Sequence, residues 1–414
     1  MHLQFIFSLE RKMKFLILLA LTLTLTMANE VALQEFTTGN NLFTAAIYRE
    51  VTKENFGNFL ISPFSIQTVF ALTQSGAKDP TAAEIRNKLN LPDSPEKTDE
   101  IYSAILPTLK GNEQYALHTA NKIYVKNDYP VKEEFKNVAS NVYQAGIENI
   151  DFTQKTEAAT AINGWVEKQT NNKIHDLIDP NTLDADTRII LINALYFKGK
   201  WVNPFESYAT RKRDFYKTPK DIVKVDTMQN TDLYNYYESP ELKAKFLEMP
   251  YLGDDISMVI VLPNEKDGLE FVESQVDKVF TTHNFTQERV SVSLPKFSIE
   301  NKVQLKKILQ NLGVNTAFTD EADLSGIAGK KGELAISDVV QKAFINVTET
   351  GTEAAAATAA VVQNFGLVSV QAVRISLEYA PNKDPKIFVA DHPFIYYITT
   401  KNVILFGGRV SNLK

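Results

Sequence analysis

Apolar residues recur at helical spacing in the first third of the chain, and strand-like runs dominate the rest. Five segments predict amphipathic helices: 28–55, 65–77, 81–89, 132–144 and 156–174. Residues 303–314 predict one later helix. Seven segments predict strands, and 246–263 and 393–410 have the form of hairpins: 118–127, 148–152, 188–201, 246–263, 291–299, 339–350 and 393–410. Helices that precede strands, with no regular βαβ rhythm, predict an α+β fold.

Composition narrows the possible chemistry. The chain has 414 residues, 44% of them hydrophobic and 23% charged, which is ample for a globular core without cross-links. It has no cysteine, so thiol nucleophiles, cysteine-bound zinc and iron–sulfur clusters are excluded. None of its five histidines lies within metal-ligand spacing of another, and we expect no metal and no cofactor. A net charge of −6 argues against a nucleic-acid partner.

The amino terminus has the pattern of a signal peptide. Basic residues at positions 11, 12 and 14 precede the apolar run 15–28, which ends in a small residue, Ala28. Met13 is an alternative start, because the sequence that follows it is a conventional signal by itself. We therefore expect residues 1–28 to be removed and 29–414 to form a single secreted, extracellular domain. No later apolar run is long enough to predict a membrane anchor.

Catalytic motifs are missing, whereas residues 349–392 are unusual. There is no GxSxG and no HExxH, so an enzyme is the weak interpretation. The alanine-rich stretch after Gly351 could be a helix or a linker. It could also be a strand, because alternate residues from Thr352 to Val362 would then form one small, uncharged face. Such a strand could enter a sheet between two neighbours, with Gly351 as its hinge.

This segment resembles the proximal hinge of the inhibitory serpins. The matching positions are Glu349, Gly351, Thr352, Glu353, Ala354, Ala355, Ala356, Ala357 and Thr358. Further blocks resemble the family in order along the mature chain, among them NFLISPFSI (58–66), LINALYFKGKWVNPF (191–205) and ADLSGI (322–327). FVADHPFIYYI (388–398) is similar to the C-terminal signature of arthropod members.

The resemblance implies a single serpin domain. Its fold would have three β-sheets, about nine helices and an exposed reactive-centre loop at about 351–387. Its function would be suicide inhibition of a serine protease. The protease would cleave the loop and remain attached as a covalent acyl complex, while the loop inserts into the central sheet of a metastable protein. A serpin-fold carrier or binding protein without inhibition is the alternative.

Other residues take structural roles through the resemblance. Ser62, Ser65 and Asn193 match hydrogen-bonding positions where the central sheet parts, and Gln341 stands where the family usually has histidine. Trp201 matches a tryptophan near the loop's entry point, although it could equally be a plain core aromatic. Asn284 is the better of two glycosylation candidates, because Asn346 lies in the strand that leads to the hinge.

The length of the loop leaves the scissile bond open between two main candidates and neighbouring positions such as Asn364 or Leu367. The family's bond lies about fourteen residues beyond the hinge glycine, which here is Phe365–Gly366 and gives an inserted strand of roughly 46 Å. Phe365 suits a chymotrypsin-like pocket. The loop is longer than usual and also contains Arg374–Ile375, a trypsin-like site that would need roughly 76 Å of strand. We expect a monomer, and the mildly acidic segment 94–115 gives no support for heparin activation.

Overall fold

The computed structural model describes residues 31–109, 115–253, 256–352 and 384–414. The expected signal peptide and most of the expected loop lie outside these residues. Within them, nine segments are α-helical: residues 31–54, α2 (Pro63–Ser75), α3 (Thr81–Lys88), α4 (Pro95–Leu109), α5 (Glu133–Asn141), α6 (Lys155–Gln169), α7 (Leu269–Glu273), α8 (Val276–Val279) and α9 (Leu305–Asn311). The α+β class and the expected number of helices are confirmed.

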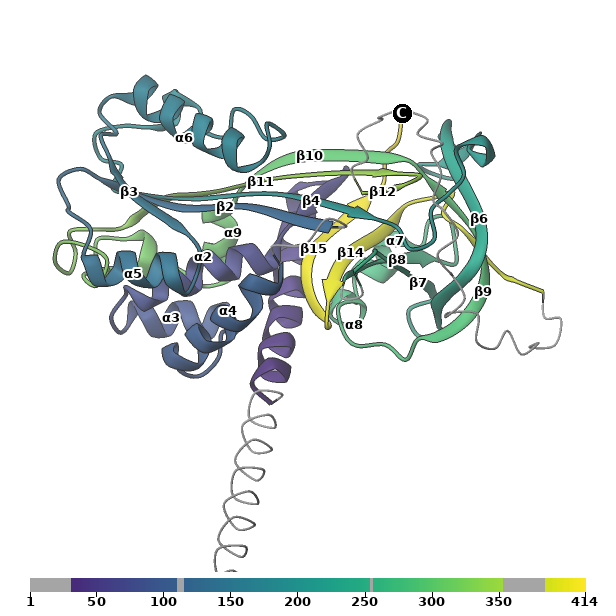
Figure 1. Ribbon diagram of the computed structural model, residues 1–414, viewed down its shortest axis with the longest axis horizontal. Helices are drawn as coiled ribbons and strands as arrows, with labels where there is room; N and C mark the ends of the chain where they lie inside the picture. The colour runs from purple at the N-terminus through teal and green to yellow at the C-terminus, as the bar shows by residue number, and fades with distance from the viewer. Residues whose placement is uncertain (1–30, 110–114, 254–255, 353–383) are drawn as a thin grey trace, which may run out of the picture.

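A six-stranded sheet crosses the middle of the molecule (Figure 1). In spatial order its strands are β10 (Phe297–Gln304), β11 (Ile336–Thr348), β12 (Gly351–Thr352), β4 (Ile189–Lys200), β2 (Tyr115–Lys126) and β3 (Gly146–Ile150). Strands β4 and β11 are parallel and pair directly from Ile189 and Ile336 as far as Tyr196 and Phe344. Beyond that point the two-residue strand β12 lies between them.

The other nine strands form one hydrogen-bonded assembly. Their order is β1 (Phe59–Ile61), β15 (Val403–Val410), β14 (Phe394–Thr400), β8 (Ile256–Pro263), β7 (Ala244–Pro250), β6 (Ile222–Ser239), β9 (Thr286–Pro295) and β13 (Lys386–Val389), with β5 (Arg211–Tyr216) also on β6. The 18-residue β6 pairs with β5 near its start and with β7 near its end. The second and third expected sheets are therefore continuous through this strand.

Helices cover both faces of the six-stranded sheet. Helix α2 lies on one face and α6 on the other (Figure 1). The Ser62 side chain caps α2, Pro63 occupies its first turn, and every residue from Pro63 to Gln74 is buried. A helix that is buried all round must lie inside the molecule. The residues under α6 form a separate small core, which includes Ile162, Ile192 and Val340.

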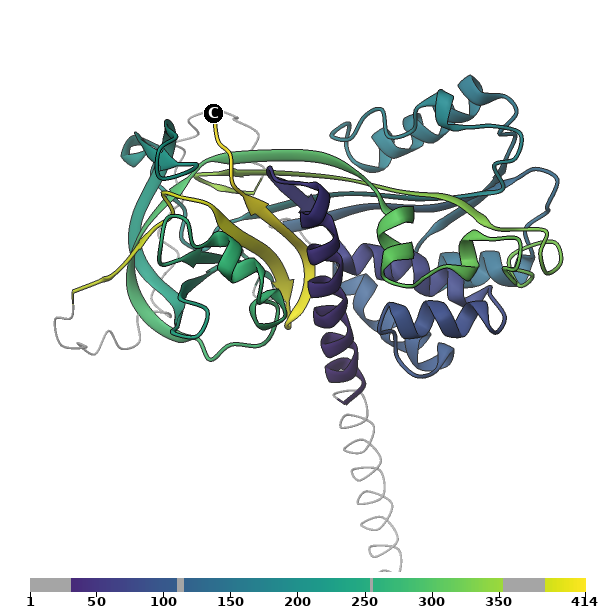
Figure 2. The same ribbon diagram turned by 180° about the vertical axis from the view of Figure 1, so that it is seen from behind.

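The helix of residues 31–54 stands beside the C-terminal hairpin β14–β15 (Figure 2). The Asn40 side chain fastens the two together, because its amide nitrogen donates to the Ile404 carbonyl and its amide oxygen accepts from the Ile404 N–H, at 3.3 and 2.7 Å. The N-terminal helix is thereby joined to the C-terminal strands of the same domain.

Two sequence expectations are wrong in detail. Residues 291–299 form two strands, because β9 ends at Pro295 and β10 begins at Phe297 in the other sheet. The helix predicted over 156–174 ends at Gln169. Asn171 and Asn172 have φ values of 51° and 56°, a left-handed conformation that terminates a helix.

Candidate functional site

The first two hinge residues are already part of the central sheet. Gly351 pairs with Thr348 of β11 and with Lys200 of β4, and Thr352 pairs with Val347 and Gly199. The two residues therefore run antiparallel to both neighbours at the point where β4 and β11 separate (Figure 1). Of the three interpretations of the alanine-rich segment, the strand holds for its first residue, Thr352. Glu353 and the residues after it lie outside the described part.

Only glycine fits at position 351. A Cβ atom built there would lie 2.0 Å from the Gly199 carbonyl oxygen, far inside van der Waals contact. The residue also has a φ of 155°, which L-residues rarely adopt. Gly351 thus lets the chain turn out of β11 and press against β4 with no side chain between them.

Thr352, the last described residue of the hinge, is completely buried. Its hydroxyl shares a 2.5 Å hydrogen bond with the Tyr251 hydroxyl. Tyr251 stacks on Trp201 with ring centroids 4.3 Å apart, and burial raises the pKa of the Tyr251 phenol well above its usual value. A small side chain with one hydroxyl satisfies this buried position, whereas an unpaired charge there would be costly to bury.

Trp201 holds the turn between β11 and β12. Its indole N–H donates to the Thr348 carbonyl at 3.0 Å, and its backbone N–H donates to the Thr350 carbonyl at 3.1 Å. It contacts the turn that leads to the hinge and is also 98% buried in the main core. This position is compatible with both interpretations of the residue, and its role at the loop's entry point stays a prediction.

Glu349 anchors the same turn from the opposite side. Lys296 lies 2.9 Å from its carboxylate, and the Thr210 hydroxyl donates to that carboxylate at 2.9 Å. Burial raises the pKa of Glu349, but the bonds from Lys296 and Thr210 outweigh burial and leave the pKa lowered. The carboxylate is therefore charged at neutral pH and holds the turn in place.

A buried polar cluster joins the sheet to α2 below the hinge. We call its five members the shutter cluster: Ser62, Ser65, Asn121, Asn193 and Gln341. The Gln341 side chain accepts from the Ser62 N–H at 2.9 Å and donates to Asn193. Asn193 donates to the Ser65 hydroxyl and to Asn121 at 2.5 and 2.7 Å. Because Asn193 is on β4 and Gln341 on β11, this cluster bridges the two strands that must part.

Sequence reasoning missed two members of the site. Asn121 accepts from both Ser65 and Asn193, and Tyr251 is the partner of Thr352. The signal for Asn121 was a polar side chain at an otherwise buried strand position, since Ala120 and the residues from Lys122 to Val125 are all buried. Tyr251 gave no sequence signal, because its role depends on a long-range bridge to Trp201 that places its hydroxyl against Thr352.

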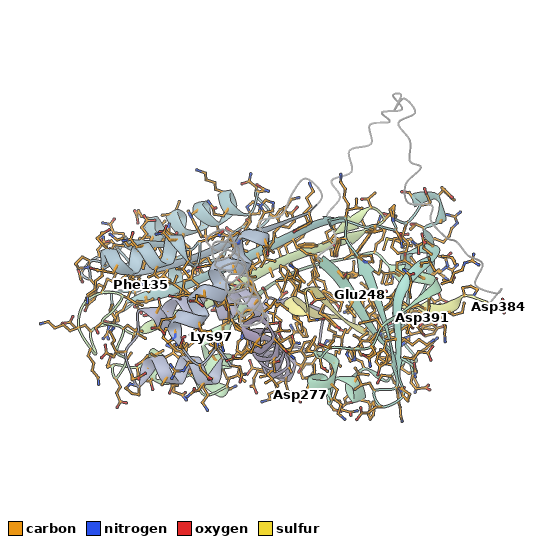
Figure 3. All side chains as sticks on the ribbon, turned by 60° about the horizontal axis from the view of Figure 1, so that its bottom comes forward. Lys97, Phe135, Glu248, Asp277, Asp384 and Asp391 are labelled. Atoms are coloured by element: carbon orange, nitrogen blue, oxygen red, sulfur yellow. The ribbon has the colours of Figure 1, made fainter. Side chains whose placement is uncertain are left out.

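The remaining predicted residues fall elsewhere. The bonds Phe365–Gly366 and Arg374–Ile375, and hinge residues 353–358, lie outside the described residues. The described chain resumes at Asp384, at the outer edge of the molecule beyond Asp391 (Figure 3). Asn284 is exposed just before β9, whereas Asn346 is half-buried and pairs with Ser298.

The described residues contain no group of three or more acidic, histidine or cysteine side chains that could hold a metal ion. Among the same residues, no helix is both long and apolar enough to cross a membrane.

Comparison with known proteins assigns this chain and its fold to one family. The family model described as serpin (serine protease inhibitor) matches residues 38–413, so the chain belongs to the serpin family. Antichymotrypsin-2 and antitrypsin of Bombyx mori are 37% and 36% identical to it, over 89% and 90% of this chain and 96% and 93% of their own. Serpin48, a highly specific serpin of the insect Tenebrio molitor, matches with a TM-score of 0.84 at 49% identity, over 92% of this chain and 99% of its own.

Family membership confirms the serpin fold and sets the enzyme interpretation aside. Serpins are protease inhibitors rather than enzymes, and serine proteases are their partners. Thyroxine-binding globulin in complex with thyroxine also has this fold, with a TM-score of 0.77 and 26% identity over 91% of this chain and 98% of its own. The fold therefore does not by itself establish inhibition. Evidence for inhibition has to come from the hinge residues.

Proposed function

We propose that this chain is a secreted serpin that inhibits a chymotrypsin-like serine protease by suicide-substrate trapping. The observation that carries the proposal is the burial of Thr352 between β4 and β11, in register with both. The next residues in the sequence are small apart from Glu353, which alternates to the opposite face of a strand. Nothing in the sequence obstructs the insertion that Thr352 begins.

Insertion of the loop lowers the free energy of the protein because it increases the pairing between strands. Strands β4 and β11 are parallel and meet along a single ladder. A strand that enters between them replaces that ladder with two antiparallel ones, as β12 already does over two residues. Two ladders hold about twice as many backbone hydrogen bonds as one, and antiparallel pairing is slightly more stable per residue. Cleavage frees the loop to complete this change.

The register of the strands supports Phe365 as the residue after which the protease cleaves. If the pairing of Thr352 with Val347 continues along β11, Gln363 comes to lie opposite Ile336 at the far end of that strand. If the pairing with Gly199 continues along β4, Val362 lies opposite Ile189. The sheet is filled just short of Phe365. Cleavage after Arg374 would leave a slack segment, and slack reduces the tension on the acyl-enzyme.

Secretion rests on the sequence of residues 1–28, and the exposed Asn284 is compatible with glycosylation on the secretory route. The target class rests on Phe365, which fits a deep apolar pocket. Relatives named antichymotrypsin and antitrypsin are about equally similar to this chain, so the comparisons do not distinguish the two classes.

Incubation with chymotrypsin and, separately, with trypsin tests the proposal. We expect a complex with chymotrypsin that survives denaturing electrophoresis. We also expect a released C-terminal peptide whose mass corresponds to a sequence that begins at Gly366. A complex with trypsin alone, and a peptide beginning at Ile375, would move the bait to Arg374. Cleavage by both enzymes without any complex would favour a carrier or binding protein.

A further inference from the structure

Positive charge gathers in one segment of the chain. Residues 198–226 contain eight basic and four acidic side chains, whereas the whole chain has a net charge of −6. The segment runs from the end of β4 through the short helix η2 (Ser207–Ala209) and strand β5 into the start of β6. A segment whose charge is opposite to that of the rest of the protein favours an acidic partner.

Most of the acidic side chains in this segment are neutralised within it. Three ion pairs hold them, at 2.8, 2.9 and 3.4 Å: Asp214 with Lys224, Asp221 with Lys217, and Asp226 with Lys212.

Two arginines of β5 keep their charge. Within the described part of the chain, Arg211 and Arg213 have no ion-pair partner. The Arg211 guanidinium donates to the Tyr208 and Thr210 carbonyls. The Arg213 guanidinium donates to the Gln229 side chain at 2.7 Å. Because these acceptors are neutral, both guanidiniums are held in position without losing their charge to a carboxylate.

The two arginines lie next to the hinge. Thr210, which precedes Arg211, donates its hydroxyl to the Glu349 carboxylate at 2.9 Å, and position 349 is two residues before the hinge glycine. Gly351 itself pairs with Lys200, near the start of the basic segment. The chain that follows the hinge rejoins the described structure at β13, in the same assembly of strands as β5 and β6. A protease bound to the loop is therefore held near this surface.

Apolar side chains are exposed beside the arginines. Tyr208 of η2 is 75% exposed, and its carbonyl is an acceptor for Arg211. Val202 and Leu233 are also exposed, and the side chain of Asn203 joins their two segments by donating to the Leu233 carbonyl at 3.1 Å. Tyrosine and arginine are enriched at protein–protein interfaces. Guanidiniums beside an exposed aromatic ring fit the surface of a folded protein better than they fit a polysaccharide.

We propose that Tyr208, Arg211 and Arg213 form an exosite, a second contact surface for the protease that attacks the loop. The partner that it fits is a protease with an acidic surface beside its substrate cleft. The proposal rests on the proposed trapping function and deepens it by naming a property of the target. Opposite charges raise the rate of encounter. The residue at the scissile bond then selects the type of cleft, and the exosite selects among proteases that share that cleft.

The test compares two forms of one protease. Chymotrypsin is used unmodified and after succinylation, which turns surface ammonium groups into carboxylates, and each form is titrated for its active fraction. The second-order rate constants of complex formation and of loop cleavage are measured in low salt and in about 1 M salt.

We expect the double variant Arg211→Gln, Arg213→Gln to react with the succinylated enzyme roughly ten times more slowly than the native protein in low salt. Salt at about 1 M should remove this difference by screening. With unmodified chymotrypsin we expect no decrease. Tyr208→Ala should react roughly five times more slowly with both forms at either salt concentration, because loss of a packing contact is not screened.

The double variant Lys330→Gln, Lys331→Gln is the matched control, because it removes the same amount of charge at another place. These exposed lysines lie in a turn near the start of α5, where the Lys132 N–H donates to the Ile327 carbonyl at 2.9 Å. Figure 1 shows α5 and β6 at opposite ends of the molecule. We expect the control to react with both forms of the enzyme at the native rate.

An unchanged rate of the arginine double variant with the succinylated enzyme would overturn the proposal. Equal slowing of the lysine double variant would also overturn it, because net charge alone would then explain the effect. Unchanged rates together with lost retention of the arginine variant on immobilised heparin would replace the protease with a polysaccharide.

Failure of the trapping function gives a different result. If the loop were cleaved without any complex, trapping would be wrong. A slower cleavage of the arginine double variant by the succinylated enzyme would still support the exosite in that case, since the encounter precedes both outcomes.

Discussion

Replacing Thr352 with arginine tests whether the hinge works as a strand. The native side chain is fully buried, is flanked by Gly199 and Val347, and is hydrogen-bonded to Tyr251. Thr352→Arg would bring a guanidinium into this fully buried site, where the partner described for the native side chain is the neutral Tyr251 hydroxyl. We expect the two hinge residues to leave the sheet and the cleaved loop to re-enter slowly.

The magnitude follows from the cost of burying the charge. An unpaired ion in a protein interior costs several kcal/mol even after relaxation. If only about 3 kcal/mol of this cost appears in the barrier to insertion, insertion slows roughly 100-fold relative to hydrolysis of the acyl-enzyme. Nearly every encounter would then release active protease and cleaved protein, and the inhibitor would become a substrate.

Thr352→Ser and Thr352→Val are the controls. Serine keeps the hydroxyl bonded to Tyr251, whereas valine keeps the shape and leaves that phenol unpaired, at a cost of about 1–3 kcal/mol. The assay titrates chymotrypsin with each variant and counts the inhibitor molecules consumed per protease inactivated. If Thr352→Arg still forms stable complexes at the native stoichiometry, insertion from this residue cannot be the mechanism.

Three further predictions concern the surrounding structure. Asn121→Ala removes a buried acceptor from two donors of the shutter cluster, and we expect a loss of about 2–4 kcal/mol in the free energy of unfolding, measured with urea. Gly351→Ala would drive a Cβ into the Gly199 carbonyl and expel the hinge, which should change the tryptophan fluorescence, whereas Gly164→Ala, where nothing lies within 4 Å, should not. Burial lowers the pKa of His283 below the value of about 6.5 that it has in the unfolded chain, so the native state resists protonation and loses stability as the pH falls below that value; His283→Phe should show a smaller drop in melting temperature between pH 7 and pH 5.

The spacing of apolar residues, and the order of the predicted helices and strands along the chain, were sufficient to predict the fold class. The long apolar segment 188–201 appears as the central strand β4, and the hairpins predicted over 246–263 and 393–410 appear as β7–β8 and β14–β15. The division at Pro295 was missed because β9 and β10 continue one strand-like pattern and differ only in the sheet they join. Sheet membership depends on long-range pairing, which a local pattern does not contain.

Features of the site that depend on the size of the residues could be predicted from the sequence. Features that depend on contacts between distant segments could not. The small, uncharged face that begins at Thr352 was visible in the sequence, and Gly351 marked its start. The contact between Thr352 and Tyr251, and the acceptor role of Asn121, arise only when distant strands are brought together. A polar residue within a buried strand indicates that a partner exists without identifying it.

The central claim is that the sheet has room between β4 and β11 for the loop as far as about Gln363, and a melting experiment tests it most directly. The native protein is cleaved once in the loop, separated from the protease, and compared with the intact protein by calorimetry. The account predicts a large rise in melting temperature, because a full-length strand then pairs with both β4 and β11. An unchanged or lower melting temperature after cleavage would show that the loop does not insert, and would contradict the account.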